Sequence, residues 1–240
     1  MNVAIVAAAG QGSRMGGRRA KQFLELAGVP VIIHTLKKFE ESAEIQRIVV
    51  VLPGEDTAGF LEIAGKYGLR KLHQVVRGGA TRAQSVWRGI QNLRPVETQI
   101  VAVHDGVRPF VTPDEIDRTV RAAEESGAAI LVAPVTDTIK RVSGGYVETT
   151  IDRDTLRRAL TPQCFRYELI YRAFESAQNL DNGVTDESYL VEQLGHKIVL
   201  VEGSARNIKL TRPEDLAVGE EMLKSMGKGG TGKGEGKKVW

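Results

Sequence analysis

Near the start of the chain stands Val3-Ala4-Ile5-Val6-Ala7-Ala8-Ala9-Gly10-Gln11-Gly12-Ser13-Arg14-Met15-Gly16, an apolar run that passes directly into a glycine-rich loop. An uninterrupted apolar run predicts a strand that is buried on both faces, as the strands of a covered parallel sheet are. The backbone amides of a glycine-rich loop can approach an anion closely, so the loop predicts a phosphate site where the strand ends.

The same alternation continues along the chain, where short apolar runs are separated by longer amphipathic stretches. This pattern predicts an α/β fold with three layers, a Rossmann-like, mostly parallel sheet with helices on both faces. The predicted strands are 3–8, 47–52, 73–76, 100–104, 128–133 and 197–202, and the predicted helices are 31–41, 56–67, 81–93, 113–126, 166–177, 186–194 and 213–226.

One segment, residues 136–155, breaks the alternation. It holds two short β-branched pieces on either side of Ser143-Gly144-Gly145, which predicts a hairpin. The hairpin is too polar to lie inside the sheet, so we expect a β-arm that protrudes from the body. We expect residues 1–226 to form a single domain that carries this arm. Residues 227–240 are rich in Gly and Lys, and we expect them to be disordered.

Composition narrows the possible partners. The net charge of +3 belongs to the last fourteen residues, which carry four Lys and one Glu, and the rest of the chain is formally neutral. Nucleic-acid binding is therefore not expected. A single cysteine, Cys164, allows no internal disulfide and is typical of the reducing cytoplasm. We expect no membrane segment, because no apolar run approaches the roughly 18–20 residues that span a bilayer, and no signal peptide is evident.

The glycine-rich loop differs from two common phosphate-binding loops. A P-loop ends in Gly-Lys-Ser/Thr, which is absent here, and the dinucleotide fingerprint has two residues between its last glycines, whereas three lie between Gly12 and Gly16. That fingerprint also requires an acid after the second strand, where this chain has Leu52-Pro53. The cations Arg14 and Lys21 follow the loop, and a nucleoside triphosphate requires such charges beside amide donors.

A series of short motifs follows this loop in a characteristic order. The motifs are Ala8-Ala9-Gly10, Gly12, Arg14-Met15-Gly16 and Lys21-Gln22-Phe23; Gly78-Gly79, Arg82 and Ser85; Val103-His104-Asp105-Gly106 and Arg108-Pro109; Pro134-Val135, Asp137-Thr138 and Lys140; Thr161-Pro162-Gln163; Thr185-Asp186-Glu187; Val201-Glu202-Gly203; and Asn207-Ile208-Lys209, Thr211 and Pro213-Glu214-Asp215. From Val3 to about Leu223, they resemble the methylerythritol phosphate cytidylyltransferase family of the non-mevalonate isoprenoid pathway.

This resemblance implies the transfer of CMP from CTP to 2-C-methyl-D-erythritol 4-phosphate, with release of pyrophosphate. Catalysis would be by positioning and charge stabilisation, because the attacking phosphate is already ionised. The resemblance implies the catalytic residues Arg14, Lys21 and Lys209. It implies the nucleotide-binding residues Ala8, Ala9, Gly10, Gly12, Gly79, Arg82 and Ser85. Mg²⁺ would be held mainly by the phosphates, with Asp105 as its protein ligand.

For the acceptor, the resemblance implies the substrate-binding residues Asp105, Gly106, Arg108, Thr138, Arg153, Thr161 and Thr185. It further implies a homodimer formed through the arm, in which Thr138 and Arg153 reach the active site of the neighbouring subunit. Two positions depart from the family pattern, with Ala80 in place of a frequent Asp and Val107 in place of a usual Ala.

Three other interpretations stay open at this point. The acceptor could be ribitol 5-phosphate or another polyol phosphate, with the same chemistry. The chain could be a nicotinamide-binding oxidoreductase, although the glycine spacing and the missing acid disfavour it. It could also be a nucleotide-binding protein without catalytic activity, although such a protein would not need Arg14, Lys21 and Lys209 together.

Overall fold

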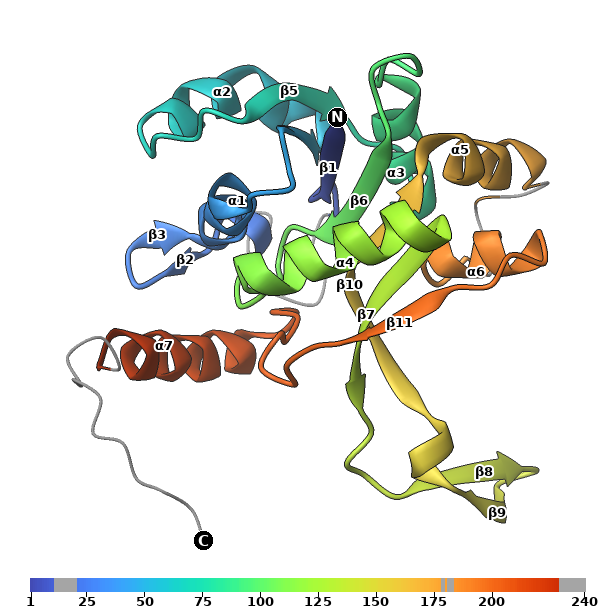
Figure 1. The fold of residues 1–240 in the computed structure, drawn as a ribbon. Helices are drawn as coiled ribbons and strands as arrows, with labels where there is room; N and C mark the ends of the chain where they lie inside the picture. Colours follow the sequence, from blue (N-terminus) through green and yellow to red (C-terminus); the bar gives the residue numbers. More distant parts are fainter. Residues whose placement is uncertain (11–20, 178–179, 181–183, 229–240) are drawn as a thin grey trace, which may run out of the picture.

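A seven-stranded sheet forms the centre of the molecule, in the strand order β11-β7-β10-β6-β1-β4-β5 (Figure 1). The structure is a computed structural model that describes residues 1–10, 21–177, 180 and 184–228. Neighbouring strands run parallel, except that β10 is antiparallel to both β6 and β7. The strands are β1 Asn2–Ala7, β4 Arg47–Leu52, β5 Leu72–Arg77, β6 Ile100–Asp105, β7 Ala128–Pro134, β10 Arg157–Arg166 and β11 Val199–Glu202.

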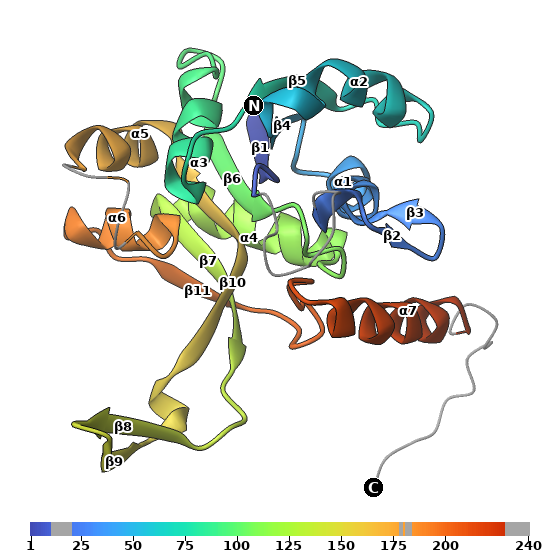
Figure 2. The same cartoon turned by 180° about the vertical axis from the view of Figure 1, so that it is seen from behind.

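Helices cover both faces of this sheet, as predicted (Figures 1 and 2). Successive residues of a strand point to opposite faces, so in β1 Ala4 and Val6 pack in one core while Val3 and Ile5 pack in the other. The first core is covered by α1 Val31–Glu41, α2 Thr57–Gly65 and α4 Pro113–Ser126, and the second by α3 Arg82–Gln91, α5 Tyr167–Ser176 and α6 Glu187–Gln193.

The last helix, α7 Pro213–Lys228, packs outside these two layers. Its residues Leu216, Met222 and Leu223 contact a small third core that contains Leu26 and Phe110. Leu26 belongs to a short hairpin of β2 Glu25–Leu26 and β3 Val29–Pro30, which the sequence analysis did not predict.

The prediction also missed β10, which lies in the middle of the sheet. Its segment begins with Arg157-Arg158, ends with Arg166 and contains Pro162, and a proline inside a run argues against a central strand. The structure accommodates the proline at an irregularity, because the pairing of β10 with β7 shifts register between Ala159 and Gln163. The residues beyond it pair regularly with β6, so the strand becomes a buried part of the sheet.

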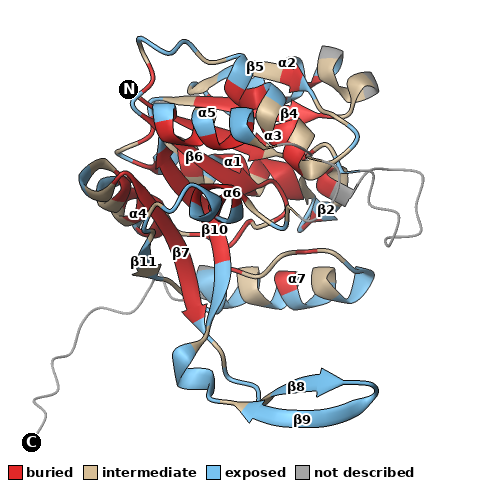
Figure 3. Cartoon of the chain, turned by 90° about the vertical axis from the view of Figure 1, so that its right-hand side faces the viewer, coloured by how far each residue is buried: buried red, intermediate tan, exposed pale blue. Residues whose placement is uncertain are grey.

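The arm is a two-stranded hairpin of β8 Ile139–Ser143 and β9 Tyr146–Ile151, and its predicted protrusion is confirmed (Figure 3). Gly144 and Gly145 form its tip with φ angles of 56° and 85°. Positive φ at both central residues is the requirement of the two-residue turns that suit the twist of a hairpin, and glycine adopts it without strain. Nearly all side chains of the arm are exposed.

Candidate functional site

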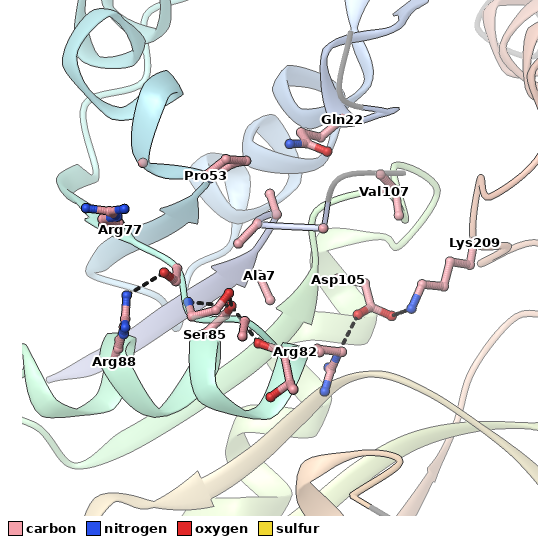
Figure 4. A pocket seen from close by; sticks show the side chains of 18 residues that line it. Ala7, Gln22, Pro53, Arg77, Arg82, Ser85, Arg88, Asp105, Val107 and Lys209 are labelled. Carbon is pink, nitrogen blue, oxygen red and sulfur yellow. Dashed lines mark hydrogen bonds and ion pairs between the residues drawn. The ribbon is translucent and has the colours of Figure 1, made fainter. Parts of the chain in front are cut away.

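A pocket of about 910 Å³ lies where β1, β4, β5 and β6 end (Figure 4). The carboxyl edge of an open α/β sheet is where such folds bind ligands. The predicted site residues that line it are Ala8, Ala9, Gly10, Gly79, Arg82, Ser85, Asp105 and Lys209. The lining residues to which the sequence analysis gave no role include Gln22, Arg77, Arg88 and Val107.

The turn after β5 is built for close approach to the end of β1. A Cβ atom on Gly78 would lie 2.3 Å from the Cβ atom of Ala9, so only glycine allows the two segments to meet there. Ser85 Oγ accepts a hydrogen bond from the Gly79 amide at 3.0 Å and donates to the Thr81 carbonyl at 2.8 Å. Arg88 Nη1 donates to the Gly78 carbonyl. These bonds fix a rigid backbone wall on one side of the pocket.

Three cations surround the carboxylate of Asp105 at the other side. Arg82 Nε lies 3.0 Å from Oδ1, and Arg108 Nε and Lys209 Nζ lie 3.1 Å and 3.0 Å from Oδ2. Burial by itself would raise the pKa of Asp105, but Arg82, Lys209 and Arg108 overcome it and hold that pKa well below its usual range. The carboxylate is therefore ionised, and it orders three positive side chains around the pocket.

Glu187, at the start of α6, is a member of this cluster that the sequence analysis left without a role. Its carboxylate is fully buried and accepts two hydrogen bonds from the Arg82 guanidinium, at 2.6 Å and 3.0 Å. Burial would lower the pKa of Arg82, but Glu187 and then Asp105 raise it above the usual value. The cluster thus contains three cations, Arg82, Arg108 and Lys209, and two carboxylates, Asp105 and Glu187. Its net charge is +1, which favours an anionic ligand.

Three other predicted residues lie behind the pocket wall. Thr161 is buried, and its Oγ accepts a hydrogen bond from the Asp105 amide at 3.2 Å and lies 3.0 Å from His104 Nδ1. Gly106 packs against the end of β1, where a Cβ atom would be 2.8 Å from the Cβ of Ala8. Arg108 also donates to the carbonyl of Asn207 at 2.8 Å. These residues hold Asp105 and the β1 end in place.

The structure does not bring the remaining acceptor-site residues into this pocket. Thr138 and Arg153 lie exposed on the arm, and Arg153 Nη1 donates to the Thr136 carbonyl at 2.8 Å. Thr185 is exposed just before α6. The predicted nucleotide-binding residue Gly12 and the predicted catalytic residue Arg14 lie outside the described residues, and so does the side chain of Lys21.

Two buried side chains, His104 and Cys164, are unsuited to acid–base or nucleophilic roles. Burial lowers the pKa of His104 to about 3, so its imidazole is neutral at physiological pH and cannot donate a proton as an imidazolium. Burial raises the pKa of Cys164, which keeps its thiol protonated and unreactive.

The described residues offer little to a metal ion. No cluster of three or more His, Cys, Asp or Glu side chains occurs among them. Asp105 is the one acid among the described residues that line the pocket, and both its oxygens already accept from cations. These residues fit Mg²⁺ only if the phosphates of a bound substrate supply most of its ligands and the protein supplies at most one carboxylate.

Comparison with known proteins agrees with this geometry. The fold and a cationic, glycine-walled pocket define an α/β nucleotidyltransferase. The family model described as IspD, 2-C-methyl-D-erythritol 4-phosphate cytidylyltransferase, matches residues 2–225. The chain belongs to this family, and it is therefore an enzyme of the cytidylyltransferase class rather than a nicotinamide-dependent oxidoreductase.

Relatives cover nearly the whole chain. The 2-C-methyl-D-erythritol 4-phosphate cytidylyltransferase of Pelotomaculum thermopropionicum is 45% identical over 224 residues, which is 92% of this chain and 94% of that protein. The protein of the same name from Bacillus velezensis is 43% identical over 93% of this chain and 96% of its own. The crystal structure of 4-diphosphocytidyl-2C-methyl-D-erythritol synthase from Anaerococcus prevotii has a TM-score of 0.81 at 32% identity, covering 93% of this chain and 98% of that one.

In the part of the chain that the structure describes, none of the helices has the length and apolar character that a membrane span requires.

Proposed function

We propose that this chain transfers CMP from CTP to 2-C-methyl-D-erythritol 4-phosphate and releases pyrophosphate, as a step in isoprenoid precursor biosynthesis. The observation that carries the proposal is the positive excess around Asp105, opposite the Gly78-Gly79 wall, in a chain of this family. Such an arrangement suits a nucleoside triphosphate. The backbone groups of the glycine wall can match the donors and acceptors of a cytosine base, and the fixed cations can bind the phosphates. The single cysteine fits a cytoplasmic location for this enzyme.

In the reaction, a phosphate oxygen of the acceptor forms a bond to the α-phosphorus of CTP. The bond from that phosphorus to the bridging oxygen of pyrophosphate breaks, and pyrophosphate leaves with the electron pair. A phosphate monoester loses its second proton with a pKa near 6, so the nucleophile needs no general base at neutral pH. This agrees with a His104 that is buried and neutral.

The chain's own contribution is then charge and position. Lys209 Nζ lies at the pocket wall, held by Asp105, and would donate to the phosphate oxygens as charge builds on them. Arg14 and Lys21 would act on the same phosphates, as the family motif implies. Mg²⁺, when bound, would neutralise part of the triphosphate charge, with Asp105 as its protein ligand. Ala8, Ala9, Gly10, Gly12, Gly79, Arg82 and Ser85 would hold the nucleotide.

The arm supports the proposal of a homodimer. Each subunit would be a single domain of residues 1–226, and the two subunits would associate through their arms. A two-stranded hairpin alone is marginally stable in water. Val142, Tyr146 and Val147 on this arm are 67%, 80% and 62% exposed, so they need a surface to pack on. A second copy placed with two-fold symmetry supplies one. Thr138 and Arg153 would then complete the partner's acceptor site together with that subunit's Thr185. Thr161 would support the same site from behind the pocket wall, where its Oγ accepts a hydrogen bond from the Asp105 amide.

The reaction is tested by measuring pyrophosphate release with Mg²⁺ and a panel of substrates. We expect turnover with CTP and 2-C-methyl-D-erythritol 4-phosphate, and much slower turnover with UTP or ATP. Ribitol 5-phosphate is the control acceptor. Equal rates with ribitol 5-phosphate would contradict the assigned acceptor and leave the chemistry intact, whereas CTP binding without turnover on any acceptor would mark a nucleotide-binding protein without activity.

The shared site is tested by mixing two inactive variants. Lys209→Ala removes a residue of a subunit's own pocket, and Arg153→Ala removes one that would serve the partner. Each mixed dimer then contains one intact site and one site that lacks both residues. Random pairing makes half of the dimers mixed, so the co-refolded mixture should recover about a quarter of the wild-type activity.

The control for this mixture is Arg172→Ala on the exposed surface of α5, which should retain full activity alone. Native mass spectrometry measures the fraction of mixed dimers. If mixed dimers form and the mixture is no more active than the separate variants, each site belongs to a single chain.

A further inference from the structure

A glutamine at the pocket wall has unused hydrogen-bonding capacity. Gln22 is fully buried, and it lines the pocket. Neither its Nε2 nor its Oε1 atom has a hydrogen-bond partner among the described residues. Buried polar groups are nearly always hydrogen-bonded, so an unpaired amide at the wall of a ligand pocket calls for a partner.

The position of Gln22 is set by its neighbours. It lies in the short helix η2 Lys21–Phe23. The next side chain, Phe23, packs against the first core, with its ring centroid 6.1 Å from that of Phe60. The Leu24 carbonyl then accepts a hydrogen bond from the Val31 amide at the start of α1. These contacts anchor the backbone around Gln22, so its amide is held at the pocket with no hydrogen-bond partner in the part of the chain that the structure describes.

The donors and the acceptor of the Gln22 amide indicate which chemical group of a ligand could bind to it. A carboxamide has two N–H donors and one carbonyl acceptor. Phosphate oxygens only accept hydrogen bonds and would leave Oε1 unpaired, whereas a hydroxyl both donates and accepts. Gln22 also lies across the pocket from Ser85 and Arg82 (Figure 4). The amide is thus separated from the backbone wall of the Gly78-Gly79 turn, the surface that suits the base.

We propose that Gln22 binds a ribose hydroxyl of the nucleotide, with Nε2 donating to it and Oε1 accepting from it. The inference rests on the proposed function for the identity of the nucleotide, CTP. An amide that is buried and unpaired among the described residues lowers the stability of the empty protein, and the nucleotide supplies its missing partner.

The test compares stability without ligand and affinity with it in Gln22→Met, which has nearly the same shape and no amide. Without nucleotide, the melting temperature should be unchanged or higher, because an unpaired buried polar group has been removed. The affinity for CTP, measured by calorimetry without acceptor, should fall about tenfold, as for two neutral hydrogen bonds. Gln91→Met, at the exposed end of α3, is the matched control and should change neither value.

Two nucleotide analogues, 2′-deoxy-CTP and 3′-deoxy-CTP, identify the hydroxyl. The wild type should bind one of them about tenfold more weakly than CTP, and Gln22→Met should bind that analogue and CTP equally well. A second variant, Gln22→Glu, places a negative charge near the triphosphate and should weaken CTP binding more than Gln22→Met does.

Other outcomes separate this inference from the proposed function. A lower melting temperature in Gln22→Met with unchanged CTP affinity would mean that the amide bonds within the protein, and the inference would be wrong. Equal losses for CTP and both deoxy analogues would overturn the assignment to a ribose hydroxyl. A wild-type protein that does not bind CTP at all would instead overturn the proposed function.

Discussion

Lys209→Ala is expected to lower kcat/KM by about 10²–10³, which corresponds to about 3–4 kcal/mol of transition-state stabilisation. Lys209 brings a positive charge to the pocket wall, where Asp105 holds its Nζ at 3.0 Å. The variant should still fold, because Asp105 keeps Arg82 and Arg108 as partners. Its melting temperature should therefore stay within a few degrees of the wild type, and the loss should appear mainly in kcat.

The measurement is steady-state pyrophosphate release with CTP and the acceptor, together with a thermal melt. Lys197→Ala, an exposed lysine before β11, is the matched control and should keep full activity. Lys21→Ala should show a loss similar to that of Lys209→Ala if the family motif is carried over correctly. Near-normal activity of Lys209→Ala would show that the phosphates bind elsewhere.

Glu187→Ala is expected to lower the free energy of unfolding by about 3 kcal/mol. Removal of one partner from a buried ion pair costs about 3–5 kcal/mol, because the other charge is left unpaired. The lower end applies here, since the Arg82 side chain is 30% exposed and keeps Asp105 as a partner. Urea unfolding followed by circular dichroism measures the change.

Glu97→Ala is the matched control for this experiment. Glu97 also contacts two arginines, Arg47 and Arg94, but its side chain is 39% exposed, so its removal should cost much less stability than the removal of Glu187. The double variant Arg82→Ala/Glu187→Ala should lose less than the sum of the single losses, because the two residues form one network. A loss for Glu187→Ala no larger than that for Glu97→Ala would show that the pair contributes little to the fold.

Much of the fold could be predicted because its signals are local. The bounds of α1, α4 and β4 agree with the prediction residue for residue. In α4 the predicted start is confirmed by a capping box, in which Thr112 and Glu115 satisfy each other's backbone amides. The polar hairpin also has a local signature, its Gly144-Gly145 turn.

The residues of the candidate site fall into two groups, those that the structure places in the pocket and those that it does not describe. Ala8, Gly79, Asp105 and Lys209 are marked by short motifs beside strand ends, and the structure brings them to one pocket. Arg14 and the side chain of Lys21 lie outside the described residues, so their part in catalysis stays a prediction.

By itself, the sequence determined the class of fold, the glycine turns and the cationic residues, because each depends on neighbours along the chain. Tertiary structure alone decided three features that depend on distant contacts. The segment of β10 forms a central strand because it pairs with β6 and β7, although it contains a proline and has arginines at both ends. Arg82 meets Glu187 across 105 positions of sequence. Packing around Phe23 buries Gln22 at the pocket with its amide unpaired among the described residues. Burial and ion pairing are properties of three-dimensional neighbours, and a local pattern does not contain them.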